Sequence, residues 1–298
     1  MCDEFTEKDN QEFLKKNGHL NRRNFGKLTT VAAFSAMLPL TGCAQTATED
    51  GGVVESEVEV TMADGVSDSY FVHPAQGKHP GILMWPDIKG LRPAFKAMGK
   101  RLAASGYSVL VVNPFYRDAK HPVAGDVPDF SDPDTRKLLF GMARKLTQDA
   151  SMSDARAYID FIDAQVSTDT NRKIGTCGYC MGGPLIMRTA GAVPDRVGAA
   201  ASFHGGGLVT DKDDSPHLLI PKSPAHVLHA VAENDDAKNP TQKTVLAAAY
   251  KAAGVPAEIE VYAGTKHGWC PPDSTVYDEA QAEKAWGRML ALYETALV

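Results

Sequence analysis

Residues 173–192 of the chain read KIGTCGYCMGGPLIMRTAGA. A buried strand is predicted over 173–177, and a helix is predicted over 181–192. Between them, one glycine stands two positions before Cys180 and another stands two positions after it, which lets a strand and a helix approach each other closely. The stretch therefore predicts a strand, a strained turn that presents Cys180, and a helix.

Cys180 occupies the place of the nucleophile in this type of turn, known as a nucleophile elbow. At a helix N-terminus, about half a positive charge from the peptide dipoles favours the thiolate over the thiol. The backbone N–H of Met181 is then expected to face the oxyanion that forms when a thiolate attacks a carbonyl group. The residue types and their spacing therefore predict nucleophilic catalysis by Cys180.

A nucleophile of this type needs a base and an acid that orients the base, and after an elbow they follow in the order acid, then histidine. Asp235 comes just after a predicted strand at 225–231, and His267 comes just after one at 257–262. Because the carboxyl ends of parallel strands meet at one edge of a sheet, we expect both side chains near the nucleophile. Asp236 is an alternative acid that the sequence leaves open.

The rest of the chain alternates between strand and helix patterns. Apolar or alternating runs predict strands at 53–60, 70–72, 81–85, 107–112, 173–177, 199–204, 225–231 and 257–262. Helical spacing of apolar residues predicts helices at 93–105, 134–166 as one helix or two, 181–192, 240–253 and 276–297. We therefore predict an α/β fold with a mainly parallel central sheet and helices on both faces, in a single domain over 53–298. The Pro-, Asp- and Gly-rich region 113–133 is expected to be a long loop on the substrate side.

The sequence GYCMGG at 178–183, together with a histidine that is followed closely by an aromatic residue, resembles the dienelactone hydrolase family of α/β-hydrolases. The resemblance covers most of residues 55–297. It implies that Cys180, Asp235 and His267 act as nucleophile, acid and base. It also implies hydrolysis of a small-molecule ester or lactone through a thioester, without a cofactor.

Further positions are implied by the same resemblance, and some depart from the family pattern. The backbone N–H of Ile88 would be the second oxyanion donor, and Asp87 stands where the family has a glutamate that contacts and activates the resting cysteine. Arg117 fills one of two arginine positions that bind the substrate carboxylate, but the other position holds Pro271. Because one charge-assisted contact is lost, dienelactone itself is only one candidate substrate. Trp269 is expected to line the pocket.

Two other functions stay open on the sequence. Cys177 and Cys180 form a C-x-x-C pair, so a thiol-disulfide oxidoreductase is one alternative, although Cys177 is expected to be a simple packing residue. A non-catalytic binding protein is the other. His204, at the end of a predicted strand and followed by three glycines, is expected to be a hydrogen-bonded structural residue, and a place at the mouth of the active site is the alternative. No cluster of histidines and carboxylates has ligand spacing, so no metal site is expected.

The charge of the chain limits its partners. The formal net charge is −6 at pH 7, and no basic stripe runs through the body of the sequence. A nucleic-acid partner is therefore not expected. We expect a monomer.

Residues 1–43 have the pattern of an export signal. Arg22 and Arg23 lie in a basic region before an apolar run at 28–40, which resembles a twin-arginine signal. As a helix this run would rise about 20 Å, short of the roughly 30 Å hydrocarbon core, so a permanent membrane span is not expected.

The apolar run leads into Leu40-Thr-Gly-Cys43, which resembles a bacterial lipobox. This predicts lipidation of Cys43 and an exported, periplasmic lipoprotein that is anchored to the membrane only by its N-terminal lipid. Cleavage near Ala44, with a soluble periplasmic product, is the alternative. Residues 44–52 are expected to be a flexible tether.

Overall fold

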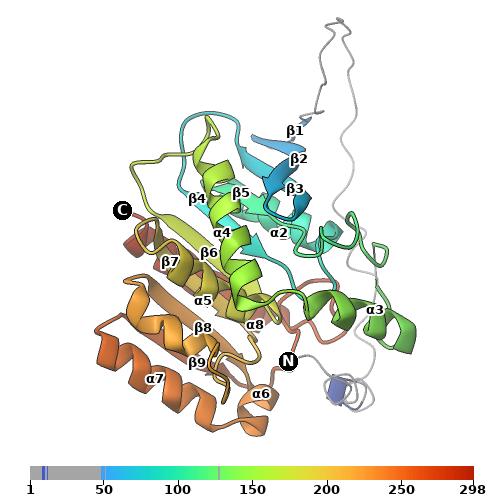
Figure 1. The fold of residues 1–298 in the computed structure, drawn as a ribbon, viewed down its shortest axis with the longest axis vertical. Helices are drawn as coiled ribbons and strands as arrows, with labels where there is room; N and C mark the ends of the chain where they lie inside the picture. Colours follow the sequence, from blue (N-terminus) through green and yellow to red (C-terminus); the bar gives the residue numbers. More distant parts are fainter. Residues whose placement is uncertain (1–8, 11, 13–47, 51, 127) are drawn as a thin grey trace, which may run out of the picture.

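The computed structural model describes residues 9–10, 12, 48–50, 52–126 and 128–298. The predicted export signal therefore lies almost entirely outside the described residues, as does Cys43 with its predicted lipidation. Within the described ranges the chain forms one α/β domain, with a nine-stranded sheet that crosses the molecule from β1 to β9 (Figure 1). The predicted fold class is confirmed.

The strand order in the sheet is β1-β2-β3-β5-β4-β6-β7-β8-β9. Strands β1, β2, β3 and β5 pair antiparallel in that order, and all pairs from β5 to β9 are parallel. Strands β4, β5 and β6 are buried at every residue, which explains why their sequences contain no charged residue and why β4 is a continuous apolar run. The strands are β1 (Thr48–Asp50), β2 (Val53–Met62), β3 (Gly65–Pro74), β4 (Gly81–Trp85), β5 (Ser108–Val111), β6 (Ile174–Tyr179), β7 (Val197–Phe203), β8 (His226–Ala232) and β9 (Ala257–Tyr262).

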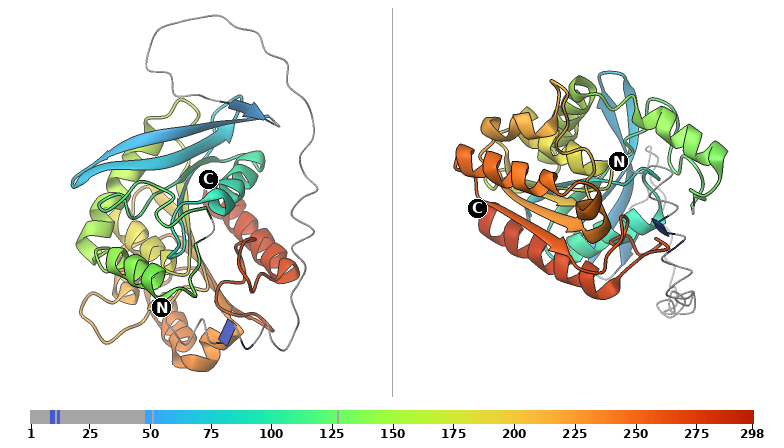
Figure 2. Two further views of the ribbon diagram at one scale, coloured as in Figure 1. Left: turned by 90° about the vertical axis from the view of Figure 1, so that its right-hand side faces the viewer. Right: turned by 90° about the horizontal axis from the view of Figure 1, so that it is seen from below.

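Helices cover both faces of the sheet, as predicted, with α4, α5 and α7 on one face and α2 and α8 on the other (Figure 2). Each face has its own core: one includes Tyr158, Ile186 and Tyr250, and the other includes Phe95 and Trp286. The helices are α2 (Pro93–Ala104), α3 (Pro133–Ala143), α4 (Gln148–Asp163), α5 (Gly182–Ala192), α6 (Glu233–Lys238), α7 (Thr241–Ala253) and α8 (Glu279–Ala296), with a 3₁₀ helix at Pro216–Lys222.

The structure decides one point that the sequence left open and differs from the predicted elements in two places. The helical region at 134–166 is two helices, because Asp132 and Thr147 each cap a separate helix through a side-chain oxygen. Helix α6 was not predicted, since six residues are too few to show a helical period. Residues 48–50, which were expected to belong to the flexible tether, form β1 and pair with β2.

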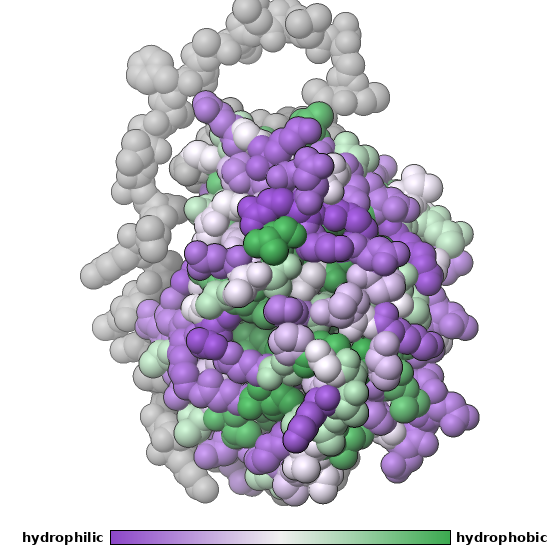
Figure 3. Space-filling model, turned by 90° about the vertical axis from the view of Figure 1, so that its left-hand side faces the viewer, coloured by the Kyte–Doolittle hydropathy of each residue, from purple (hydrophilic) through white to green (hydrophobic). Residues whose placement is uncertain are grey.

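The surface is mainly hydrophilic on the side drawn in Figure 3, where hydrophobic residues form small separate groups. The large apolar side chains that are exposed, such as Val166 and Leu218, belong to different elements. Among the described helices, none has both the length and the apolar character that a membrane span requires.

Candidate active site

The turn between β6 and α5 is strained at Cys180, whose φ is +54°. Its backbone N–H donates to the carbonyl of Phe203 at 2.9 Å, which fixes the turn to the end of β7. A Cβ at Gly178 would lie 2.1 Å from the carbonyl oxygen of Gly182, and a Cβ at Gly182 would lie 2.6 Å from that of Trp85. Neither position can hold a larger residue without movement of the backbone, so the predicted elbow is present.

His267 joins the nucleophile position to a carboxylate. Its Nδ1–H donates to Asp235 at 2.7 Å, and its side chain also hydrogen-bonds Cys180. The backbone N–H of His267 donates to the side-chain oxygen of Asn234 at 2.8 Å, which holds the loop after β9 against α6. The competing acid, Asp236, accepts from Lys243 at 2.6 Å instead. The structure thus brings these three predicted residues together, with His267 in the middle and hydrogen-bonded to both Cys180 and Asp235.

The electrostatics of these three residues favour an ion pair. Burial alone lowers the pKa of His267, but the negative charges of Cys180 and Asp235 outweigh burial and raise it. Burial raises the pKa of Asp235, but the His267 imidazolium outweighs this effect and leaves the carboxyl pKa lowered. The arrangement therefore favours a thiolate beside an imidazolium that is held by a carboxylate.

Asp87 lies in the loop after β4 and is held by Arg92 rather than being free to turn. Its two oxygens accept from the two terminal nitrogens of Arg92 at 2.7 and 2.9 Å, and one of them also accepts from the backbone N–H of Lys89. Burial raises the pKa of Asp87, but the charge of Arg92 outweighs it, so the pKa is lowered. Both carboxylate oxygens of Asp87 thus take part in a buried ion pair with Arg92, and its role in activating the thiol stays a prediction.

Ile88, the expected second oxyanion donor, follows Asp87 directly and is buried. The start of α5 lies against the start of this loop, because Gly182 approaches the backbones of Trp85 and Pro86. The two segments that carry the predicted oxyanion donors, Met181 and Ile88, are therefore neighbours.

Arg117 does not have the surroundings expected of a substrate-binding residue. Its terminal nitrogens each donate to Asp154 at 2.7 Å, and its Nε donates to Asp64 at 2.8 Å. These bonds direct the guanidinium to α4 and to the turn between β2 and β3. The prediction that Arg117 binds substrate is therefore corrected: its charge is paired within the protein.

Trp269 also departs from its predicted role, because its side chain is fully buried and stacks on Tyr262 with ring centroids 4.7 Å apart. It packs in the core beneath α8 instead of lining an open pocket. A cavity of about 190 Å³ does open between α2 and α8, with Tyr179, Phe203 and Cys270 in its wall. Cys180 itself is only 3% exposed, so the reacting groups are enclosed in this structure.

His204 lies beside the catalytic groups, which is the alternative that the sequence left open for it. It follows β7 with a φ of +41°, is 1% exposed, and lies edge-to-face against His267 with ring centroids 5.0 Å apart. Burial first, and then the charge of His267, lower its pKa to about 3, so the ring is neutral at ordinary pH. Neither ring nitrogen has a hydrogen-bond partner in the part of the chain that the structure describes, contrary to the expected hydrogen-bonded role.

Cys177 lies in the core under α8, three residues before the nucleophile position, and it is a free cysteine. Burial raises the pKa of its thiol to about 12. Such a thiol is almost entirely protonated at neutral pH and is a poor partner in disulfide exchange. Among the described residues, no group of three or more His, Cys, Asp or Glu side chains is arranged to hold a metal ion.

A mainly parallel sheet with an elbow after β6, an acid after β8 and a histidine after β9 defines an α/β-hydrolase. The model of the dienelactone hydrolase family matches residues 67–297. The chain belongs to this family.

Individual relatives agree with this assignment. A protein named "Putative carboxymethylenebutenolidase" from Methylorubrum extorquens is 27% identical over 280 residues, which is 91% of this chain and 91% of the relative. A crystal structure from Klebsiella pneumoniae, described as a "Putative Dienelactone Hydrolase", is similar with a TM-score of 0.70 and 22% identity, and covers 81% of this chain and 98% of its own. At that identity the structural match shows the shared fold alone.

Proposed function

We propose that this enzyme hydrolyses a carboxylic ester or lactone, with Cys180 as nucleophile, His267 as base and Asp235 as the orienting acid. The observation that carries the proposal is the linked hydrogen bonding of these three side chains at the ends of β6, β8 and β9, with Cys180 in a strained turn. A name that includes carboxymethylenebutenolidase, given to a relative 27% identical to this chain, points to the same class of substrate.

In the proposed reaction, the thiolate of Cys180 attacks the carbonyl carbon, and the oxyanion accepts from the backbone N–H groups of Met181 and Ile88. His267 gives its proton to the leaving oxygen, which breaks the ester bond and leaves a thioester. A water then attacks the thioester while His267 takes its proton, and the acid product and the thiolate are released. In a lactone the leaving oxygen stays attached, so the product is a hydroxy acid.

The redox alternative finds less support. A thiol-disulfide oxidoreductase needs a second reactive thiol, whereas Cys177 is buried under α8 with a raised pKa. The strained turn and the Asp235–His267 pair have no part in such a reaction. A non-catalytic binding protein would not need these features either.

The test is a comparison of three forms of the full chain on dienelactone, simple lactones and p-nitrophenyl acetate. We expect the wild-type chain and Cys177→Ala to hydrolyse at least one of them, and Cys180→Ala to lose this activity. Turnover that survives in Cys180→Ala would rule out the mechanism. Reduction of a disulfide substrate that depends on both cysteines, without hydrolysis, would favour the redox function.

We propose in addition that residues 1–43 export the protein by the twin-arginine route and that Cys43 becomes lipidated. The support is the sequence pattern alone, in which the Arg22-Arg23 pair precedes an apolar run and a lipobox-like LTGC. Replacing Arg22-Arg23 by two lysines should retain the protein in the cytoplasm. The Cys43→Ala variant should lose incorporation of labelled fatty acid, and unchanged labelling would contradict the lipidation.

A further inference from the structure

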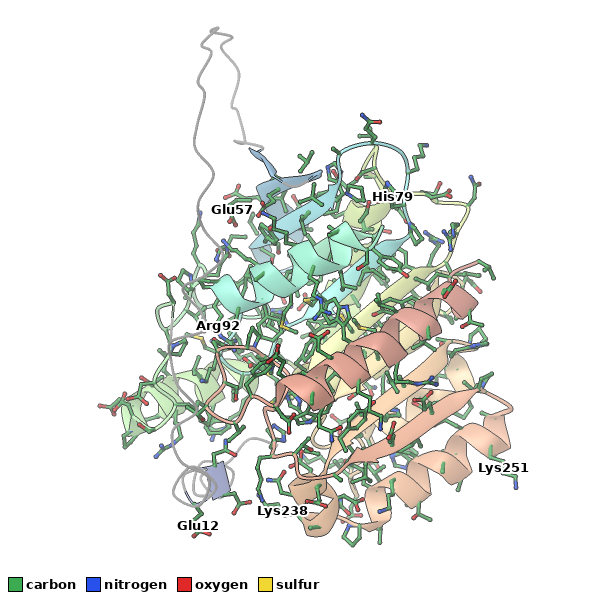
Figure 4. The ribbon with its side chains drawn as sticks, turned by 180° about the vertical axis from the view of Figure 1, so that it is seen from behind. Glu12, Glu57, His79, Arg92, Lys238 and Lys251 are labelled. Carbon is green, nitrogen blue, oxygen red and sulfur yellow. The ribbon has the colours of Figure 1, made fainter. Side chains whose placement is uncertain are left out.

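We infer that Asp273 makes this hydrolase prefer substrates whose acyl group is uncharged, because it takes up further donors of a buried arginine and adds a second carboxylate to the ion pair that this arginine makes with Asp87. The inference rests on the proposed function and adds the charge of the substrate to it. The arginine concerned is Arg92, which lies beside the start of α2 (Figure 4).

Every N–H of the Arg92 guanidinium is used within the protein. A guanidinium has five N–H donors, and Arg92 makes five contacts with acceptors. Two go to Asp87 at 2.7 and 2.9 Å, two go to Asp273 at 2.6 and 3.0 Å, and one goes to the carbonyl of Gly90 at 3.2 Å. The Arg92 side chain is 1% exposed. An incoming carboxylate therefore finds no donor on Arg92 unless one of the two aspartates leaves.

The ion pair lies between the two loops that border the catalytic groups. Asp87 directly precedes Ile88 in the loop after β4, and Asp273 follows His267 by six residues in the loop before α8. The charges of Asp87 and Asp235 both act on His204, whose ring lies against His267, so this side of the site is already acidic. A negatively charged acyl group would have to enter next to these carboxylates.

The two positions at which the family pattern predicts arginines for a substrate carboxylate do not replace Arg92. Arg117 is paired with Asp154 and Asp64, and position 271 holds a proline. Lys89 is half-buried in the loop after β4, where its charge acts on Asp87. Lys89 is the one cation of that loop besides Arg92, so the test must separate it from Asp273.

Of the two aspartates, Asp273 is the one that sets the preference. The Asp87 side chain is held by both terminal nitrogens of Arg92 and by the N–H of Lys89. The Asp273 side chain is 16% exposed and comes from a different loop. An asparagine at 273 would keep the size of the side chain and remove its charge, so that Arg92 and Asp87 remain as a neutral pair in place of a cluster with one net negative charge.

The experiment compares two esters of equal length on the full chain: methyl p-nitrophenyl adipate, which is uncharged, and mono-p-nitrophenyl adipate, which is anionic. We expect wild-type kcat/KM to be at least about tenfold higher for the uncharged ester, which corresponds to about 1.4 kcal/mol. Asp273→Asn should raise the relative kcat/KM of the anionic ester by about tenfold. Asp273→Glu, which keeps the carboxylate, should retain the wild-type preference, and Lys89→Met should leave the ratio of the two substrates unchanged.

Equal rates on both esters, or a preference for the anionic one that Lys89→Met abolishes, would overturn the inference. So would an unchanged ratio in an Asp273→Asn variant that unfolds at the same temperature as the wild type. If neither ester is hydrolysed, the proposed function fails on these substrates, and calorimetric binding of both esters to Cys180→Ala still decides the charge preference. Tighter binding of the anionic ester would then overturn the inference, and tighter binding of the uncharged ester would support it.

Discussion

At the scale of single residues, the account depends on which carboxylate holds His267. Asp235 bonds its Nδ1 at 2.7 Å, while the adjacent Asp236 is paired with Lys243. The sequence left both open, because two neighbouring aspartates after the same strand cannot be told apart by spacing. The contact that distinguishes them is the hydrogen bond between His267 and Asp235, which spans 32 positions in the sequence.

Replacing Asp235 should therefore weaken catalysis, and replacing its neighbour should not. We expect Asp235→Asn to lower kcat by at least about a hundredfold, because the imidazole loses its orienting acceptor. Asp236→Asn is the matched control, and its kcat should stay close to that of the wild type. Steady-state kinetics on the best ester checks both, and the reverse order of effects would transfer the acid role to Asp236.

The charge state of Cys180 makes a second prediction at this scale. Because Cys180 and Asp235 raise the pKa of His267, the imidazolium should persist above the ordinary value of about 6.5 and keep the thiolate charged below neutral pH. Iodoacetamide should therefore alkylate Cys180 already at pH 6. In His267→Ala, the alkylation rate of Cys180 should be low at pH 6 and should rise only as the pH approaches the ordinary thiol pKa of about 8.5.

Mass mapping of the alkylated peptides provides the internal control. Cys177, whose pKa burial raises to about 12, should remain unmodified in the folded protein at the same pH. Alkylation of Cys180 that follows an ordinary thiol curve in the wild type would contradict the ion pair.

The role of a single residue could be predicted from the sequence where a local motif defines it. The prediction failed where the role depends on a partner that is distant in the sequence. The elbow fixed Cys180 from its own neighbours. Arg117 was expected to bind substrate, but its partners Asp64 and Asp154 come from segments far away in the sequence. The same is true of Arg92 and Asp273, whose ion pair spans 181 positions.

At the scale of elements, the strand–turn–helix unit of β6 and α5 is held by close backbone approach. Gly178 faces the carbonyl of Gly182, and Gly182 faces that of Trp85. Since these contacts are with backbone atoms, a neighbouring side chain cannot relieve them by changing its rotamer.

A methyl group at Gly178 should therefore be costly. We expect Gly178→Ala to lower the free energy of unfolding by about 3 kcal/mol or more, because its Cβ would meet a backbone oxygen. Gly287→Ala is the control: this exposed glycine in α8 has no atom within 4 Å of an added Cβ, so alanine should raise the free energy of unfolding by up to about 1 kcal/mol. Urea unfolding of both variants checks the prediction, which an equally stable Gly178→Ala would contradict.

The elements themselves were predictable to the extent that burial shapes their sequences. Strand β4 was predicted with its observed bounds, because a strand buried on both faces of a parallel sheet needs an unbroken apolar run. The division between α3 and α4 depends on capping by Asp132 and Thr147. The spacing of apolar residues alone does not predict where a capping residue ends one helix and begins the next. Strand β1 exists through its local hairpin pairing with β2, and its three polar residues have no strand pattern of their own.

At the scale of the whole molecule, α8 completes the core of one face of the sheet. Trp286, Met289, Tyr293 and Leu297 are buried in the same cluster as the strand residues beneath them. Burial of each such side chain contributes about 1.5–3 kcal/mol, and their sum is comparable with the total stability of about 5–15 kcal/mol expected for a domain.

A chain that ends at residue 278 should therefore fail to fold. We expect it to lose cooperative thermal unfolding and hydrolytic activity together, because the loss of α8 exposes the α2/α8 core. Removal of Val298 alone, which is 77% exposed, should leave the melting curve unchanged. A folded, active chain without α8 would contradict this view of the domain as one cooperative unit.

The central claim, that Cys180 carries the acyl group, can be tested directly by trapping the thioester. The full chain is mixed with a slowly hydrolysed p-nitrophenyl ester, quenched in acid and analysed by intact mass and peptide mapping. We predict a mass increase of one acyl group on the peptide that contains Cys180, absent from Cys180→Ala and present in Cys177→Ala. Turnover of the ester with no acyl group on Cys180, or with the acyl group on another residue, would contradict the mechanism.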